Sequence, residues 1–373
     1  MNKTIGIFGG GQLGRMMAQA ALPLNIQCSF FEAETDCPAA ILGPVFSSKD
    51  PQALQAFIAS AEVFSLEFEN TPVADVDVLT QTKTLHPPRL ALATAQNRLA
   101  EKGLFDELAI PVAPYRAVDS LQSLKQAVDE LGLPIVLKTV TGGYDGKGQF
   151  VLRSEDQIDT AWAELGPAKS LIAESFVKFS REVSIIAVRG QDGDVKTWAL
   201  AENHHHNGIL SHSIVPAPNS IDLQPVAQDY ITRLLNHLNY VGVLTLELFV
   251  TEQGLYANEM ACRVHNSGHW SIEGAICSQF ENHIRAVAGL PLGATDVVRP
   301  TVMVNIIGQH PKSEDVLALK GAHLHLYNKS ERAGRKLGHI TLMPNNSDEL
   351  TDLCRQLAQI LPVPLALTTD MNI

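Results

Sequence analysis

The chain has few aromatic residues, a modest share of charged residues and no long apolar run. Aromatic residues make up 6% of its 373 residues and charged residues 18%, and acidic side chains outnumber basic ones by 40 to 28. The formal net charge of −12 argues against a nucleic-acid-binding surface, because phosphate contacts need a basic footprint. No apolar stretch reaches the roughly 18 residues that a membrane helix needs. An anionic substrate must therefore be held by local cations.

Cysteine is scarce and shows no metal-binding pattern. The five cysteines are Cys28, Cys37, Cys262, Cys277 and Cys354. Their number is odd and their spacing includes no CxxC, and no apolar leader-like segment opens the chain. We therefore expect a reduced, cytoplasmic protein that is not attached to a membrane.

The length is sufficient for two or three domains with ample core. An apolar run at 4–8, a glycine turn and an amphipathic helix predict a βαβ opening, with a second strand that ends at Glu32 and a third at 63–68. Asp50-Pro51 predicts a helix start. The predicted fold class is α/β, in part α+β, with a parallel α/β domain (1–92), a lid (93–176) and an antiparallel catalytic core with a small C-terminal β region (177–373).

The remaining elements are predicted as follows. A helix that starts near Thr94 enters the lid. Beyond residue 177, antiparallel strands at 182–189 and 195–200 and a hairpin around Glu247 alternate with helices near 225–239 and 272–288. Short strands are expected from about Val298 onward.

A glycine-rich loop after a short strand predicts a phosphate-binding site. The apolar run at 134–139 presents Lys138, and the loop Gly142-Gly143-Tyr144-Asp145-Gly146-Lys147-Gly148 follows. Glycines let backbone N–H groups approach anionic oxygens, and the lysines add full charges. The alternative is a tight surface hairpin, but Asp-Gly alone would close one, so the longer insertion favours phosphate binding.

Two glutamates in the hairpin at 241–260 predict a metal site. Alternation places Leu244, Leu246 and Leu248 on one face of the strand and Glu247 on the other. The returning strand brings Asn258 or Glu259 opposite Glu247, depending on register. Facing carboxylates repel unless a cation lies between them, and Mg²⁺ prefers such oxygen ligands together with nucleotide phosphates. The alternative is a pair of exposed hairpin glutamates.

Taken in order, these motifs resemble the ATP-grasp ligases, and more narrowly the N5-carboxyaminoimidazole ribonucleotide synthetase family of purine biosynthesis. Three further motifs carry that resemblance. They are the glycine turn at 10–16, the segment from Arg263 to Trp270 and the sequence Gly-Arg-Lys-Leu-Gly-His at 334–339. The match runs essentially from end to end.

The resemblance implies ATP and Mg²⁺, or Mn²⁺, as cofactors. Arg98 would contact phosphate, Lys138 the α-phosphate and the adenine side, the backbone at 174–177 adenine, and Glu182 the ribose. Glu247 and Glu259 would hold the metal. The implied ATP-binding residues are Arg98, Lys138, Gly143, Tyr144, Asp145, Gly146, Lys147, Gly148, Gln149, Glu174, Ser175, Phe176, Val177, Glu182, His205, Asn258 and Glu259.

The resemblance also implies a ribonucleotide site and a reaction. Its substrate-binding residues would be Gln12, Leu13, Glu69, Arg263, Lys329, Arg335 and Lys336, and its catalytic residues Tyr144, Asp145, Lys147, His265, Asn266, Lys329 and Arg335. Arg263 to Trp270 would form an anion pocket with the N-terminus of a helix beginning near Ser271. Lys147 departs from the family, in which arginine is common, so a point charge replaces a bidentate donor.

The implied activity is ATP-dependent carboxylation of 5-aminoimidazole ribonucleotide with bicarbonate through carboxyphosphate, by a homodimer with small-molecule substrates. The nearest alternative is a formate-dependent glycinamide ribonucleotide transformylase, and biotin carboxylase fits a chain of this length less well. The turn at 9–14 followed by Glu32 also approximates a dinucleotide fingerprint, which leaves an NAD-dependent oxidoreductase as a distant alternative. A non-catalytic nucleotide-binding module is a third. His204-His205-His206 is not a predicted metal site, since adjacent strand residues point to opposite faces.

Overall fold

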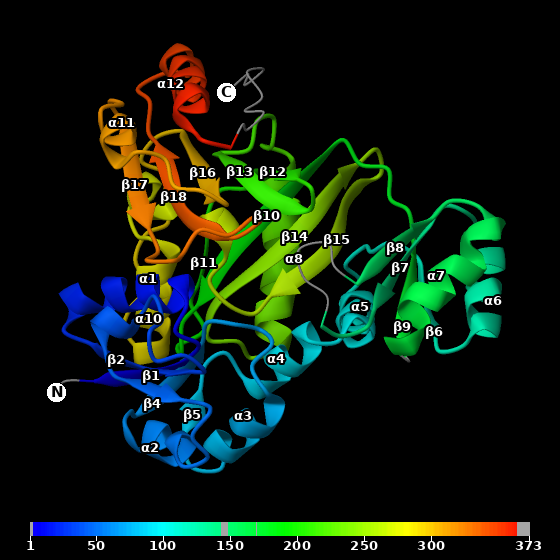
Figure 1. Ribbon diagram of the computed structural model, residues 1–373, viewed down its shortest axis with the longest axis horizontal. Coiled ribbons are helices and arrows are strands. Elements are labelled where there is room, and N and C mark those ends of the chain that lie inside the picture. The colour runs from blue at the N-terminus through cyan, green and yellow to red at the C-terminus, as the bar shows by residue number, and fades with distance from the viewer. Residues whose placement is uncertain (1–2, 143–147, 169, 364–373) are drawn as a thin grey trace.

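The computed structural model describes residues 3–142, 148–168 and 170–363 of the chain (Figure 1). Within those ranges the strands form sheets of five, four and nine strands. Figure 1 shows the four-stranded sheet projecting to one side, the five-stranded sheet below, and the large sheet running up to the C-terminal helices. In the same ranges no helix is both long and apolar enough to cross a membrane.

The five-stranded sheet is parallel and belongs to the N-terminal part of the chain. Its order is β3 (Val45–Ser47), β2 (Gln27–Glu32), β1 (Thr4–Phe8), β4 (Val63–Leu66) and β5 (Thr84–Leu85). It is accompanied by α1 (Gln12–Ala21), α2 (Ala53–Ala59) and α3 (Val73–Thr80). Apolar residues fill both faces of the central strands, as parallel sheets require, which confirms the predicted βαβ opening.

Two boundaries in this region differ from the predictions. The third strand ends at Leu66 and leaves Glu67 beyond the strand. The second helix begins at Ala53, two residues after Pro51, because the side chain of Asp50 accepts the N–H of Gln52 at 2.9 Å and holds a turn first.

The four-stranded sheet is the predicted lid and has its own core. Its antiparallel order is β6 (Tyr115–Val118), β9 (Leu171–Ser175), β7 (Ile135–Thr139) and β8 (Gln149–Leu152), with α6 (Leu121–Leu131) and α7 (Ile158–Leu165) packed against it. The single helix predicted from near Thr94 is instead two helices, α4 (Arg89–Ala95) and α5 (Arg98–Glu107). Asn97 separates them because its side chain caps α5, accepting the N–H groups of Leu99 and Ala100 at 3.0 and 3.1 Å.

The nine-stranded sheet joins the catalytic hairpin to the C-terminal region. Its order is β15 (Gly254–Ala261), β14 (Gly242–Thr251), β10 (Arg181–Arg189), β12 (Ala201–His206), β13 (Ile209–Val215), β16 (Thr301–Ile307), β18 (Lys336–Leu342) and β17 (Ala322–Leu326), with β11 (Val195–Thr197) beside β10. The predicted separate β region is thus continuous with the catalytic sheet through β13 and β16. The prediction of short strands alone missed α11 (Ser313–Leu317) and α12 (Ser347–Ile360).

Helices of the core fix the large sheet to the N-terminal sheet. The predicted helix at 225–239 is α8 (Leu223–His237), whereas the one predicted at 272–288 divides into α9 (Ser271–Gly274) and α10 (Gln279–Ala288). Ser278 caps α10 by accepting the N–H of Glu281 at 3.1 Å. His283 on α10 is fully buried and joins Ser65, at 2.7 Å, to the N–H of Val243, at 3.1 Å. The two sheets therefore share one rigid support.

One predicted domain boundary falls inside a helix and the other falls between two strands. Residue 92 lies inside α4, and residue 176 lies in the connection between β9 and β10. The boundaries stay predictions.

Candidate functional site

Lys138 projects from β7, one residue before the strand ends, toward a buried carboxylate. It lies on β7, paired with Gln149 of β8, and its Nζ donates to Glu174 Oε2 at 3.0 Å. Gly142 and Gly148 both have positive φ, at 77° and 71°, so glycine suits the backbone where the loop leaves β7 and enters β8. Gly143, Tyr144, Asp145, Gly146 and Lys147 lie outside the described residues.

Glu174 is buried at the end of β9 and is surrounded by cations. Burial raises its pKa, but Lys102 and Lys138 outweigh that effect and hold the pKa below its ordinary value. Its Oε1 is buried and has no hydrogen-bond partner among the described residues. The N–H groups of Ser175 and Phe176, in the connection that follows, already donate to the carbonyls of Pro114 and Pro134. A base bound here would therefore meet the carbonyls of this connection, the backbone of Val177 or the carboxylate of Glu174.

The two proposed metal ligands face each other across the hairpin. The register pairs Glu247 of β14 with Glu259 of β15, which resolves the alternative left open by the sequence. His265 Nε2 lies 3.1 Å from Glu247 Oε1, and Arg98 Nη1 lies 3.1 Å from Glu259 Oε2. Burial raises the pKa of Glu247, but the opposite effect of His265 and its other neighbours is larger, so the pKa lies below its ordinary value. Each carboxylate thus has one basic side chain 3.1 Å from one of its oxygens.

Glu182 and His205 lie on neighbouring strands of the same sheet. His205 Nδ1 is 3.4 Å from Glu182 Oε2. Burial lowers the pKa of His205, but Glu182 and Glu247 raise it above its ordinary value overall. In the neighbouring position His204 stacks on His212, with ring centroids 4.3 Å apart, and its Nε2 is 3.1 Å from Glu202 Oε1.

Arg263 and Glu69 form a partly buried pair between the large sheet and the N-terminal sheet. Arg263 binds the carboxylate through Nε and through Nη2, the latter at 2.7 Å. Burial raises the pKa of Glu69, but Arg263 lowers it to about 2, and the same pairing raises the pKa of Arg263. Glu69, predicted to receive ribose hydroxyls, is therefore engaged by a cation.

The segment after Arg263 differs from the predicted anion pocket. The helix expected to begin near Ser271 is α9, which has four residues, so it supplies no extended helix N-terminus. Asn266 instead forms a reciprocal amide pair with the buried Asn305 of β16, at 3.0 and 2.7 Å. The orientation of His265 is fixed by two contacts. Its ring Nδ1 lies 2.9 Å from Ser267 Oγ, and its backbone N–H donates to Gln279 Oε1 at 2.9 Å.

The C-terminal cations reach the N-terminal glycine turn. The ammonium group of Lys329 donates to Gln12 Oε1, although 317 positions separate the two residues. Burial, followed by the nearby Arg335, Lys336 and Arg332, lowers the pKa of Lys329 to about 8, whereas Glu67 acts in the opposite direction. Arg335 donates to Ser330 Oγ at 2.8 Å, and Lys336 opens β18.

Known proteins share both the sequence and the fold. Three family models match: a ribonucleotide synthetase preATP-grasp domain at residues 1–96, an ATP-grasp domain at 103–280 and a phosphoribosylaminoimidazole carboxylase C-terminal domain at 301–352. An N5-carboxyaminoimidazole ribonucleotide synthase of Pseudomonas aeruginosa is 46% identical over 340 residues, which cover 91% of this chain and 94% of the relative. The chain belongs to the N5-carboxyaminoimidazole ribonucleotide synthase family.

Solved structures of the family superpose closely on this fold. The N5-carboxyaminoimidazole ribonucleotide synthetase from Thermus thermophilus has a TM-score of 0.92 and 44% identity, with 96% of this chain and 99% of that chain covered. An N5-carboxyaminoimidazole synthase from Aspergillus clavatus, in complex with ADP and 5-aminoimidazole ribonucleotide, has a TM-score of 0.88 and 29% identity, with 96% and 99% covered.

Glu67 is a residue of this synthase fold that the sequence analysis did not single out. Its carboxylate is buried and accepts the N–H of Gly11 at 2.5 Å and the N–H of Leu13 at 3.1 Å. A Cβ at Gly9 would lie 2.7 Å from Glu67 Oε2, and one at Gly11 would also collide with the carboxylate. The glycines of this turn therefore accommodate an internal carboxylate.

This internal carboxylate argues against the dinucleotide alternative. A dinucleotide fold uses the N–H groups at the start of the first helix for a pyrophosphate. Here those N–H groups are bound by Glu67, and Glu32, in the position of the ribose-binding acid, accepts the N–H of Gly10 at 3.0 Å. The signal in the sequence was Glu67 itself, directly after a buried strand that ends beside the glycine turn.

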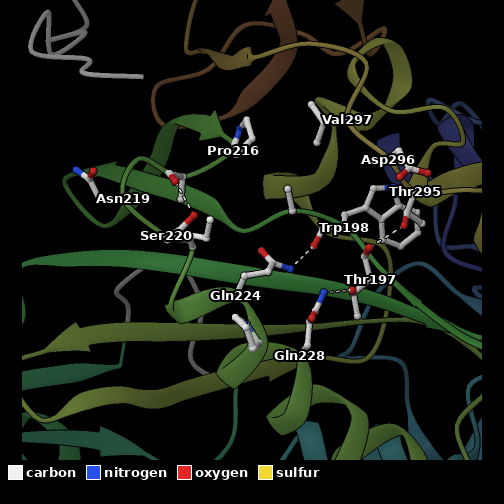
Figure 2. Close-up of a pocket in the computed structure, with 14 residues that line it drawn as sticks. Thr197, Trp198, Pro216, Asn219, Ser220, Gln224, Gln228, Thr295, Asp296 and Val297 are labelled. Carbon is white, nitrogen blue, oxygen red and sulfur yellow. Dashed lines mark hydrogen bonds between the residues drawn. The ribbon is translucent and has the colours of Figure 1, made fainter.

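A cavity of about 580 Å³ lies elsewhere, between α8, the end of β13 and the loop at 295–297 (Figure 2). None of its lining residues is a predicted site residue. Its polar side chains bind one another or the backbone: Gln224 Nε2 donates to Trp198 O at 3.1 Å, Gln228 Nε2 to Thr197 Oγ1 at 2.7 Å, and Thr295 Oγ1 to Thr197 O at 2.7 Å. These groups are accounted for by the fold.

The Glu67→Gln variant should alter the pH dependence of stability. Burial raises the pKa of Glu67 from 4.5 to about 7. A raised pKa means that its stabilisation is complete below pH 4.5 and is lost as pH rises to about 7. Because each tenfold change in an ionisation constant corresponds to about 1.4 kcal/mol, the native chain should lose about 3 kcal/mol across this window that the variant does not lose. Urea unfolding from pH 4.5 to 8 measures this, and parallel curves for both proteins would refute it.

Proposed function

We propose that this chain uses ATP to join bicarbonate to the 5-amino group of 5-aminoimidazole ribonucleotide, forming N5-carboxyaminoimidazole ribonucleotide, ADP and phosphate in purine biosynthesis. The observation that carries the proposal is the convergence of a facing carboxylate pair, Glu247 and Glu259, with the Lys138 edge of the lid and with cations at the far end of the same sheet. The family to which the chain belongs supports it. The expectations of a homodimer and of a cytoplasmic location stay predictions.

At the nucleotide end, the residues suit ATP with Mg²⁺. Glu247 and Glu259 offer carboxylate oxygens on one face and are partly accessible, with exposed side-chain fractions of 17% and 43%. Two protein carboxylates leave most of an octahedral sphere to phosphate oxygens and water, which Mg²⁺ prefers and Mn²⁺ also accepts. The ion would neutralise charge on the transferring phosphoryl group. Arg98 and Lys138 would contact phosphate oxygens, and Glu182 and His205 would contact the ribose.

At the substrate end, the cations suit a ribonucleotide 5′-phosphate. Lys329, Arg335 and Lys336 gather beside Gln12, and in an acidic protein such a cluster is the natural receptor for a dianion. Leu13 is buried behind the same turn. Glu69 and Arg263 neutralise each other, so a ribose hydroxyl or a bicarbonate oxygen would bind beside the pair while the two charges stay in contact.

The reaction takes two steps. A bicarbonate oxygen attacks the γ-phosphorus of ATP, the bond to the β–γ bridging oxygen breaks, and carboxyphosphate and ADP form. The amine then bonds to the carboxyl carbon, the carbon–oxygen bond to phosphate breaks, and the amine proton is lost. Asp145 is proposed to orient that amine or to accept its proton. Tyr144, Lys147, His265 and Asn266 are proposed to lie around the reacting groups. A closed lid would exclude water from carboxyphosphate.

The isotope experiment that tests this function follows the bicarbonate oxygen. ¹⁸O-labelled bicarbonate, used before its label exchanges with water, should place ¹⁸O in inorganic phosphate when 5-aminoimidazole ribonucleotide and ATP are present. One bicarbonate oxygen becomes the bridging oxygen of carboxyphosphate and stays with phosphorus when the carbon–oxygen bond breaks. Mass spectrometry of phosphate measures it. Unlabelled phosphate, or faster turnover with formate and glycinamide ribonucleotide, would favour the transformylase instead.

Glu259→Gln should abolish ATP turnover more completely than Glu247→Gln, with little loss of fold. The amide keeps the shape of the side chain but removes a charged metal ligand, and in Glu259→Gln it also leaves Arg98 without its partner. Turnover as a function of Mg²⁺ concentration and the unfolding temperature measure the two effects. Glu252→Gln, in the exposed turn of the same hairpin, is the matched control. Unchanged Mg²⁺ dependence in Glu259→Gln would remove the metal assignment.

Lys329→Ala should raise the apparent constant for the ribonucleotide by about tenfold or more and change that for ATP little. Loss of a charge-assisted contact costs about 1.5–3 kcal/mol at the site that uses it. Steady-state kinetics with each substrate varied in turn measures the split, and Lys320→Ala, which removes an exposed lysine of the same region, is the control. Equal effects on both constants would place Lys329 elsewhere.

A further inference from the structure

One face of α5 contacts the strand that carries Glu259. Arg98, Glu101 and Lys102 are spaced i, i+3 and i+4, so their side chains share that face. Arg98 binds the Glu259 carboxylate, and the other two bind the backbone on either side of it. Figure 1 shows α5 between the lid sheet and the large sheet. The helix that enters the lid is thus attached to the proposed metal edge.

The backbone at this point needs such support because the ladder is interrupted. Glu247 pairs with Glu259, but the next residue, Leu248, pairs with Ala257, so Asn258 is an extra residue and forms a β-bulge. Lys102 Nζ donates to the carbonyl of Asn258 at 2.9 Å, and Glu101 Oε1 accepts the N–H of Met260 at 2.7 Å. β15 is the edge strand of the large sheet, and side chains of α5 thus bind two of its backbone groups on either side of Glu259.

Lys102 has a second contact in the lid sheet. Its Nζ lies 3.7 Å from Glu174 Oε2, the same oxygen that Lys138 contacts at 3.0 Å. The Lys102 side chain is only 2% exposed, and a buried cation is tolerated only where carboxylates and carbonyls surround it. The one ammonium group therefore joins β9, next to the proposed base-binding connection, to β15, next to the proposed metal ligand.

We propose that Lys102 is a positioning residue that couples the two ends of the nucleotide site, holding Glu174 and the Asn258–Glu259 bulge in one frame. The inference rests on the proposed ATP site. If Lys102 is removed, Glu174 keeps Lys138 and Glu259 keeps Arg98. The two ends then stay connected through α5 and through the backbone at 111–114, which bonds to Ala257 and Ser175, but no side chain among the described residues joins Glu174 to the bulge directly. The metal should then add less to nucleotide binding, because the base end and the metal end are no longer aligned.

The test compares ADP binding with and without Mg²⁺ in Lys102→Met, by isothermal titration calorimetry without bicarbonate or ribonucleotide. The ratio of the two dissociation constants measures how much the metal strengthens binding. We expect that ratio to fall about tenfold or more in the variant. The constant for 5-aminoimidazole ribonucleotide, measured separately, should stay within about twofold of the native value.

Lys125→Met, which removes an exposed lysine from a lid helix, is the matched control and should leave the ratio unchanged. Lys102→Gln keeps an N–H donor for the Asn258 carbonyl and should recover part of the ratio. A lower unfolding temperature with an unchanged ratio would overturn the proposal, and so would failure of both Lys102 variants to fold, since each outcome would assign Lys102 to stability alone. Because no acceptor is used, either result is independent of which acid the enzyme activates.

Discussion

The rest of the site depends on the repulsion between Glu247 and Glu259. Like charges directly opposite each other in an antiparallel ladder are destabilising, and the low local dielectric around partly buried side chains increases the effect. The fold places one basic side chain beside each carboxylate, His265 beside Glu247 and Arg98 beside Glu259. His265 belongs to the segment that follows β15, and Arg98 is the first residue of α5. The need to offset this repulsion thus brings three parts of the chain to one point.

The same requirement organises the surrounding buried charges. Glu174 lies between Lys102 and Lys138, and Glu69 is bound by Arg263 through two nitrogens. Breaking such a pair from one side leaves a buried charge, which is far more costly than removing both partners. The Glu69–Arg263 pair joins segments of two different sheets, and the Glu174–Lys102 pair joins a sheet to a helix, so these charged groups also set the relative position of the elements that carry them. Stability and function are therefore tied together in this site, and a substitution at one pair is expected to affect both.

Local patterns in the sequence were sufficient for the strands that carry Lys138 and Glu247, because a short apolar run and an alternation of apolar residues are each visible without tertiary partners. The partner of Glu247 could not be decided, since it depends on a bulge at Asn258 that has no local signature. Lys102 and Glu67 were missed for a related reason: a buried charge looks like a surface charge until its partners are known. The break at Asn97 was also missed, although asparagine is a residue type that commonly caps a helix. The pairing of β16 with β13 joins segments that are far apart in the chain. The spacing of apolar residues within a strand does not predict such a contact.

Two glycine-rich segments of this chain follow a strand, yet the charged side chains placed beside them differ. The turn at 9–14 has its N–H groups filled by the carboxylate of Glu67, and a second carboxylate, Glu32, holds Gly10. An anionic pyrophosphate would have to displace an internal anion there. The loop after β7 begins beside Lys138, whose carboxylate partner already has Lys102 as a second cation, so the lysine can turn toward a phosphate without leaving Glu174 unpaired. Backbone conformation alone therefore does not decide whether a glycine turn can accept a pyrophosphate. The charge placed against the turn by distant residues decides it.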